Sequence, residues 1–266
     1  MSFFSSIGAF LSAKEMDGVD INSEDRLVAH RIVLKKKIML RNVFSEFHDQ
    51  FMNLDIKFFS DVLGLRLELG AGVCPIKDSY SDVLSTDIVA SDDHDIVLDA
   101  QSMNLADASV RAIYGSNCFH HFSDPDEFFS ELNRVLSSGG GAILIEPYYG
   151  PLASIMYQHL FSEEGFDKKM NGWKTPSSGP ASDANQALSY VVFKRDLSIF
   201  NQKYPDLEIV YQKPLMNYMR YFMSGGLNFV SLVPDFMEVP LRAIEFLMAP
   251  FAKFFALHHI IVIRHK

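Results

Sequence analysis

The chain has very little cysteine. Its 266 residues include only two, Cys74 and Cys118. Two cysteines cannot form the dense disulfide framework of small secreted domains, so we expect a reducing compartment. They also lie too far apart in the sequence for the paired spacing of a cysteine zinc site. The sequence therefore predicts neither a disulfide scaffold nor a metal site.

Basic residues and long apolar runs are also scarce. Lys and Arg number 24 against 33 Asp and Glu, a net charge of −9, whereas broad nucleic-acid binding needs a basic surface. The nearest approach to a membrane-spanning run, residues 244–263, is interrupted by charged residues and by Pro250, so we predict no spanning helix. The apolar start lacks the basic residues that normally precede a signal peptide. A cytoplasmic location is therefore expected.

Apolar residues, by contrast, are abundant. They make up 48% of the chain, and charged residues make up 21%, a composition that supports a sizeable core. The length favours one large domain with additions. Residues 1–60 are expected to form an N-terminal helical extension, because Phe44, Phe47 and Phe51 recur at helical spacings. Residues 61–266 are expected to form the main domain.

The apolar pattern changes from a helical to a strand-like period after residue 60. A helix is predicted from Asp124-Pro125, and we expect it to end at the glycines 139–141. Strands that alternate with helices indicate an α/β fold: a doubly wound, Rossmann-like sheet of seven mostly parallel strands with helices on both faces. The predicted strands are residues 65–69, 82–87, 96–99, 110–119, 142–145, 207–211 and 260–263.

Two stretches interrupt this pattern, at about residues 148–205 and 214–257, and we predict insertions there. The second, a helical insertion before the last strand, has an amphipathic pattern at 241–255 that is broken or kinked at Pro250. This pattern and the apolar residues 3–11 offer surfaces for peripheral membrane contact, a lipid-linked substrate or a homodimer. Because cations on their polar faces are few, a lid or dimer surface is favoured over a membrane anchor.

Polar groups and glycines follow the predicted strands, at the edge where open α/β sheets bind ligands. Glycines after the first strand let a ligand lie against the backbone. A carboxylate after the second strand, Asp87, can accept two ribose hydroxyls, and one after the third, Asp99, can accept a hydrogen bond from an adenine amino group. The candidate cofactor-binding residues are Glu68, Gly70, Ala71, Gly72, Asp87, Ile88, Asp99, Ala100 and Asn117.

This ordered set resembles the core of class I S-adenosylmethionine-dependent methyltransferases, close to the small-molecule group that includes the ubiquinone-type enzymes. The family's acidic-x-Gly-x-Gly motif matches residues 68–72, and its ribose-binding and adenine-contacting acids match Asp87 and Asp99. Its fourth-strand motif matches residues 117–122, and its Arg-Val-Leu-x-x-Gly-Gly motif matches residues 134–140. The resemblance implies S-adenosylmethionine as cofactor and S-adenosylhomocysteine as product.

The chain departs from the family pattern at two places. Cys74 stands where the family has the third glycine of its loop, and the segment between Asp87 and Asp99 is too short for the usual helix. Cys74 and Cys118 are expected near the cofactor, either as small buried apolar residues or as a redox-regulated pair.

The resemblance also implies a reaction, the displacement of the sulfonium methyl group by a nucleophile. A base helps when the nucleophile is a hydroxyl, and His120 and His121 are the candidate catalytic residues, because histidine can be neutral near pH 7. We predict transfer to the oxygen of a small-molecule, lipid-linked or sugar-linked acceptor with an apolar or ring-shaped part. The candidate residues of the acceptor pocket are Tyr148, Tyr149, His159, Glu163 and Asp167.

Two functions of other classes use the same residues. A nicotinamide-dependent oxidoreductase would use the glycine loop and Asp87, but its fingerprint needs a third glycine where Pro75 stands. A non-catalytic cofactor-binding or regulatory protein would keep the fold without the chemistry.

The negative charge of the chain is concentrated in one segment. Residues 78–107 contain eight Asp and no Lys, Arg or Glu. Asp87 and Asp99 belong to this segment, so the acidity lies on the predicted ribose and adenine side of the site. Its field should favour a cationic sulfonium ligand.

Overall fold

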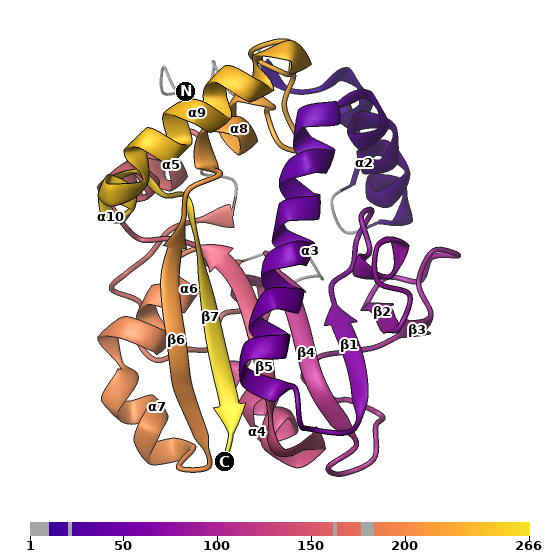
Figure 1. The fold of residues 1–266 in the computed structure, drawn as a ribbon, viewed down its shortest axis with the longest axis vertical. Coiled ribbons are helices and arrows are strands. Elements are labelled where there is room, and N and C mark those ends of the chain that lie inside the picture. Colours follow the sequence, from indigo (N-terminus) through magenta and orange to yellow (C-terminus); the bar gives the residue numbers. More distant parts are fainter. Residues whose placement is uncertain (1–10, 21–22, 162–163, 177–183) are drawn as a thin grey trace.

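A computed structural model describes residues 11–20, 23–161, 164–176 and 184–266. Its centre is one sheet with the strand order β3-β2-β1-β4-β5-β7-β6 (Figure 1). The first five strands are parallel, and β7 runs antiparallel between β5 and β6. The predicted doubly wound, mostly parallel sheet of seven strands is therefore confirmed. The strands are β1 (Leu65–Leu69), β2 (Val83–Asp87), β3 (Ile96–Val97), β4 (Val110–Ser116), β5 (Leu136–Pro147), β6 (Leu207–Leu215) and β7 (His258–His265).

Helices cover both faces of the sheet (Figure 1). On one face α3 (Ile38–Phe59) buries Phe47 and Phe51 against the strands. On the other face α4 (Pro125–Val135) and α7 (Leu197–Lys203) bury Phe129 and Phe200. The other helices are α2 (Glu24–Lys36), α5 (Pro151–His159), α6 (Leu188–Tyr190), α8 (Tyr218–Met223), α9 (Glu238–Met248) and α10 (Ala252–Phe255). Short helical turns are η1 (Lys14–Met16), η2 (Ile76–Asp78), η3 (Phe119–His121), η5 (Val191–Arg195), η6 (Asp235–Met237) and η7 (Ala249–Phe251).

The glycines at 139–141 lie inside β5 and not, as predicted, at the end of the preceding helix. The neighbouring backbones explain the difference. A Cβ on Gly140 would lie 2.5 Å from the carbonyl oxygen of Arg111, and one on Gly141 would lie 2.1 Å from that of Ile263. The glycines therefore serve to let β4 and β7 approach β5 closely.

The two predicted insertions contribute the helices α5 to α7 and α8 to α10, and α8, α9 and α10 lie beyond the carboxyl ends of the parallel strands (Figure 1). The predicted break at Pro250 is confirmed, because α9 gives way there to η7 and α10. The N-terminal residues dock on the second insertion: Ser12 forms a β-bridge with Phe229, and Lys37 Nζ donates to the carbonyl of Gly226 over 2.6 Å. These two contacts hold the N-terminal residues and the second insertion together above the carboxyl edge of the sheet.

None of the described helices combines the length and apolarity that crossing a membrane requires. The region from η6 to η7 nevertheless exposes more than half of the side chains of Phe236, Phe246, Leu247 and Phe251. Residues 3–10, which belong to the predicted N-terminal apolar face, lie outside the described residues.

Candidate active site

A cavity of about 630 Å³ lies beyond the carboxyl ends of β1, β2 and β4. Small-molecule sites have volumes of about 300–1,000 Å³. Every predicted cofactor-binding residue lines this cavity, and so do His120 and His121. The fold thus brings together the strand-end residues that the sequence spreads from 68 to 121.

The loop after β1 is shaped by two glycines in the left-handed region, with φ of +63° at Gly70 and +55° at Gly72. A Cβ on Gly70 would lie 2.9 Å from Cys118 Cβ, whereas the nearest atom to a Cβ on Gly72 would be 3.9 Å away. The N–H of Ala71 donates to the carbonyl of Thr86 over 2.9 Å. The loop is therefore fixed against β2 and offers a cradle of bare backbone to a ligand.

Asp87, at the end of β2, is buried and holds the glycine loop. Its Oδ2 accepts from the N–H of Gly72 and its Oδ1 from the N–H of Val89, each over 3.0 Å. A carboxylate oxygen can accept more than one hydrogen bond, so both oxygens keep capacity for ribose hydroxyls. Ile88 beside it is 47% exposed and lines the cavity.

The short stretch between Asp87 and Asp99, which is described throughout, forms turns and β3 but no helix, as predicted. His94 ties it to the glycine loop, with Nε2 2.8 Å from the carbonyl oxygen of Gly72. Asp99 Oδ1 accepts from the N–H of Gln101 over 2.8 Å. These contacts, and not a helix, hold the chain on the predicted adenine side of the cavity.

Buried groups on the cavity wall fit a polar, positively charged cofactor. Ser116 Oγ is buried and has no hydrogen-bond partner among the described residues. Glu68 Oε2 accepts from the N–H of Ile76 over 2.7 Å, and burial raises the pKa of Glu68 to about 8. Asn117 has a φ of +52°, and its N–H donates to the carbonyl of Ile145 over 2.8 Å. This turn directs the chain after β4 along the cavity.

In the fold, nearby cations compensate part of the negative charge of the acidic segment 78–107. Several of its aspartates form ion pairs with cations from outside the segment, whereas Asp87 and Asp99 line the cavity. Of the aspartates in this segment, Asp87 and Asp99 are therefore the ones placed to attract a cationic ligand in the cavity. The ion pairs are Asp82–Arg66, Asp93–Arg31, Asp95–Lys77 and Asp107–Arg134.

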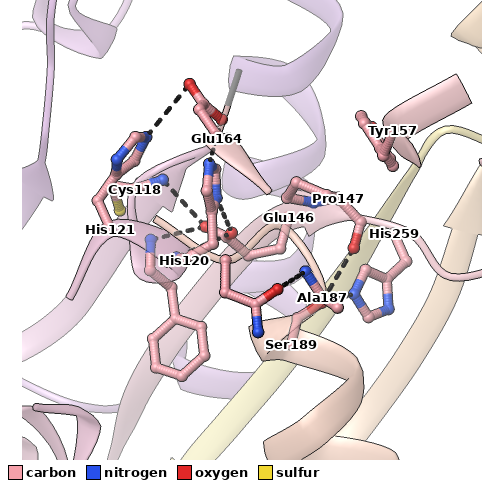
Figure 2. Close-up of polar contacts among 12 residues, drawn as sticks. Cys118, His120, His121, Glu146, Pro147, Tyr157, Glu164, Ala187, Ser189 and His259 are labelled. Carbon is pink, nitrogen blue, oxygen red and sulfur yellow. Dashed lines mark hydrogen bonds and ion pairs between the residues drawn. The ribbon is translucent and has the colours of Figure 1, made fainter. Parts of the chain in front are cut away.

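His120, in η3 after β4, is held by Glu146 near the end of β5 (Figure 2). Both residues are buried, and His120 Nδ1 lies 2.7 Å from Glu146 Oε2. Glu146 Oε1 accepts from the N–H groups of Cys118 and Phe119 over 3.0 and 2.8 Å. The carboxylate is thus fixed by the backbone and fixes the imidazole ring in turn.

Glu164, in the loop after α5, faces both histidines (Figure 2). Its Oε2 lies 3.3 Å from His120 Nε2, and its Oε1 lies 3.9 Å from His121 Nε2. Burial alone would lower the pKa of His120, but Glu146 and Glu164 outweigh it and raise that pKa to about 10. Burial and the charge of His120 lower the pKa of His121 to about 3. Against the opposing effect of burial, the contact with His120 lowers the pKa of Glu164 to about 2. In the free protein at pH 7, therefore, His120 is charged, His121 is neutral and Glu164 is ionised.

The sequence alone predicts no specific role for Glu146 or Glu164. Glu146 had a signal, because it is an acidic residue at the end of a parallel strand. No sequence feature marks Glu164, because it lies in a predicted insertion that matches no motif. Only the fold brings it close to the histidines.

The residues predicted for the acceptor pocket take other places. Tyr148 and Tyr149 pack ring against ring, with centroids 4.5 Å apart, and both rings contact His259. His159 and Asp167 are exposed. These four residues are absent from the described part of the cavity lining, and Glu163 lies outside the described residues. The side of the cavity next to the histidines is lined by Arg26, His30, Phe44, Phe47, Tyr157, Phe161, Tyr221 and Phe229.

Cys74 and Cys118 both line the cavity as free thiols. Burial raises the pKa of Cys74 to about 12 and that of Cys118 well above its ordinary value. A thiol is nucleophilic as its thiolate, and burial disfavours that form of both groups. This favours a packing role over a redox-regulated pair.

Comparison with known proteins agrees with the motifs. Residues 70–144 match the family model described as a methyltransferase domain, and a sequence search of curated proteins gives no match. The chain is similar to geranyl diphosphate C-methyltransferase from Streptomyces coelicolor A3(2), crystallised with Mg²⁺, geranyl diphosphate and S-adenosyl-L-homocysteine. The TM-score is 0.52 and the sequence identity is 12%, and the match covers 96% of this chain and 89% of that chain. It is also similar to phosphoethanolamine N-methyltransferase 2 from Haemonchus contortus in complex with S-adenosyl-L-methionine. Here the TM-score is 0.44 and the sequence identity is 13%, and the match covers 82% of this chain and 52% of that chain.

The first of these structures shows the fold. The domain match spans the glycine loop, Asp87, Asp99 and the histidine pair, and it supports the methyltransferase prediction, with S-adenosylmethionine as cofactor, over the nicotinamide-dependent alternative. Motifs, fold and domain match agree: residues 70–144 match a methyltransferase domain, and the sheet has the Rossmann-like fold shared with the first of these methyltransferase structures.

Proposed function

We propose that the chain is an S-adenosylmethionine-dependent methyltransferase that transfers the methyl group to a hydroxyl oxygen of a small-molecule acceptor. One observation carries the proposal. A single cavity joins the glycine cradle and the acidic strand ends to a cluster of His120, His121 and Glu164. Cofactor and acceptor would therefore lie side by side in one cavity, which is what a direct displacement requires.

The residues on the cofactor side fit S-adenosylmethionine. Asp87 would accept the ribose hydroxyls and Asp99 the adenine amino group, and the backbone of residues 70–72 would lie against the ligand. Glu68 offers a buried carboxyl group that can balance a positive charge. The cofactor supplies the electrophilic methyl group, and this chain's part is to bind it, orient it and exclude water.

The opposite side of the cavity fits an acceptor with an apolar or ring-shaped part. Phe44, Tyr157 and Phe161 supply aromatic walls. Arg26 Nε is buried and has no hydrogen-bond partner among the described residues, so it suits an anionic or strongly polar group of the acceptor. A lipid-linked or sugar-linked acceptor would meet the same requirements.

The transfer forms a bond between the acceptor oxygen and the methyl carbon as the carbon–sulfur bond breaks. The electron pair of that bond stays on sulfur, which gives S-adenosylhomocysteine. The hydroxyl proton leaves by way of the His120–His121–Glu164 cluster, which contains both predicted catalytic histidines.

Two measurements test the proposal. Calorimetry should show binding of S-adenosylmethionine and S-adenosylhomocysteine; if neither binds, the proposal fails. A panel of phenols, alcohols, sugars and amines, incubated with methyl-labelled cofactor and analysed by mass spectrometry, should give an O-methyl product. With that acceptor, His121→Ala should lower turnover by about 100-fold and leave the affinity for S-adenosylhomocysteine unchanged. A label on nitrogen or carbon contradicts transfer to oxygen, and cofactor binding without any transfer favours the non-catalytic alternative.

A further inference from the structure

The three side chains of the polar cluster converge on one point. One ligand atom from each of His120, His121 and Glu164 lies within 4.8 Å of the other two. The contacts to Glu164 are 3.3 Å from His120 and 3.9 Å from His121. Ligand atoms about 2.0–2.2 Å from a zinc ion at tetrahedral angles are about 3.4 Å apart. The spacing of the cluster is therefore close to that of a metal site.

The surroundings of His120 are those of a metal ligand. Histidines that bind metals donate their other N–H to a carboxylate, which fixes the ring and raises the basicity of the ligating nitrogen. Glu146 occupies that position 2.7 Å from His120 Nδ1, and the backbone of Cys118 and Phe119 fixes Glu146. His120 Nε2 is thereby aimed at Glu164 (Figure 2).

His121 is poorly satisfied by the protein alone. Its ring packs on that of His120, with centroids 4.3 Å apart, and its Nδ1 is buried without a partner among the described residues. Its Nε2 faces Glu164 across 3.9 Å, too far for a hydrogen bond. Two adjacent imidazoles that face one carboxylate are the arrangement in which a shared cation would join all three groups.

We propose that His120, His121 and Glu164 bind one divalent transition-metal ion on the acceptor side of the cavity. Two imidazoles and a carboxylate suit zinc and its neighbours in the first transition row. Three protein ligands leave a coordination position open, and the Glu164 side chain is 36% exposed at the cavity. The sequence predicts no metal because no cluster of Cys and His has metal-site spacing; the third ligand lies in a predicted insertion without a motif.

The metal site adds a chemical role to the proposed function. It rests on that function only in that the acceptor is taken to bind beside the ion. An ion at this point would bind the acceptor hydroxyl as a Lewis acid and lower its pKa, so that the proton leaves to water. With the ion bound, His120 and His121 would act as ligands, and water would replace the proton route through the histidines that the metal-free cluster offers. The competing arrangement is a metal-free one in which a protonated His120 joins Glu146 and Glu164.

The test uses the full-length chain after treatment with chelator and dialysis, titrated by calorimetry with Zn²⁺ and by absorption with Co²⁺. We expect one equivalent of each ion per chain and visible Co²⁺ absorption bands. His121→Gln and Glu164→Gln should each weaken Zn²⁺ binding by about tenfold or more. Glu146→Gln, which removes no ligand, should weaken it by about 10–100-fold. His265→Gln, in β7 outside the cavity, is the matched control and should bind Zn²⁺ like the unaltered chain.

The outcomes separate the metal site from the proposed function. A chain that binds no equivalent of either ion, or variants at His121 and Glu164 that bind Zn²⁺ as tightly as the control, overturns the metal site. S-adenosylhomocysteine is titrated into every variant as a check on folding. If that ligand binds and zinc does not, the metal site fails and the proposed function stands. If zinc binds as expected and neither cofactor form binds, the metal site stands and the proposed function fails.

Discussion

The two halves of the cavity are built in different ways. The cofactor half consists of strand ends and short loops, so that each position lies within a few residues of a strand, as Gly70 follows β1 and Asp87 ends β2. The acceptor half is assembled from α2, α3, the loop after α5 and the loop after α8, which are far apart in the sequence. The comparison teaches that the sheet specifies the proposed cofactor site locally, whereas the proposed acceptor site depends on how the additions pack.

The largest expected effect is a difference in stability between alanine substitutions at the two glycines of the cofactor half. Both have positive φ, which costs a side chain about 1–2 kcal/mol, but only at Gly70 does a Cβ clash, at 2.9 Å from Cys118 Cβ. Overpacking adds about 1–3 kcal/mol. We expect Gly70→Ala to lower the free energy of unfolding by about 2–5 kcal/mol and to abolish binding of S-adenosylhomocysteine, and Gly72→Ala to cost about 1–2 kcal/mol. Denaturant unfolding measures both; equal losses would show that the contact with Cys118 is unimportant.

A second pair of variants contrasts the halves directly. Asp87→Asn should weaken S-adenosylhomocysteine binding by about 10–100-fold, because hydrogen bonds to a charged group contribute about 1.5–3 kcal/mol. Phe161→Ala, on the acceptor wall, should change that affinity by less than about threefold, within the usual effect of a distant substitution. Calorimetry with the two variants decides. A large loss with Phe161→Ala would mean that the halves are not independent.

A smaller effect concerns protons. The pKa of Glu68 is raised to about 8 in the free protein, so the group is mostly protonated at pH 7. A cationic ligand favours the ionised carboxylate. Binding of S-adenosylmethionine at pH 7 should therefore release up to about one proton, and its affinity should rise with pH until about pH 8 and then level off.

The release is measured by calorimetry in two buffers of different ionisation enthalpy. Glu68→Gln keeps an acceptor for the N–H of Ile76 and should abolish the release. The same proton release from this variant would assign the effect to another group.

The sequence allowed the prediction of whatever depends on local pattern. Alternation predicted the sheet. The positions of Gly70, Gly72 and Asp87 directly after strands, together with the resemblance to the methyltransferase motifs, predicted the cofactor half. The placing of the glycines 139–141 at a helix end was wrong because their role is set by the backbones of β4 and β7, which come from distant sequence. Glu164 was not predicted for the same reason, because its position next to His120 depends on how distant segments pack.

The place of β7 has a consequence for how the chain is made. Within the described strands β6 pairs only with β7, and β5 borders β7 on one side. During synthesis on the ribosome, β6 therefore lacks a partner and β5 keeps a bare edge until residues 258–265 have emerged. Unpaired edges invite association between chains. A chain interrupted before residue 258 would leave β6 unpaired and the edge of β5 bare, so β7 is the strand that removes both open edges.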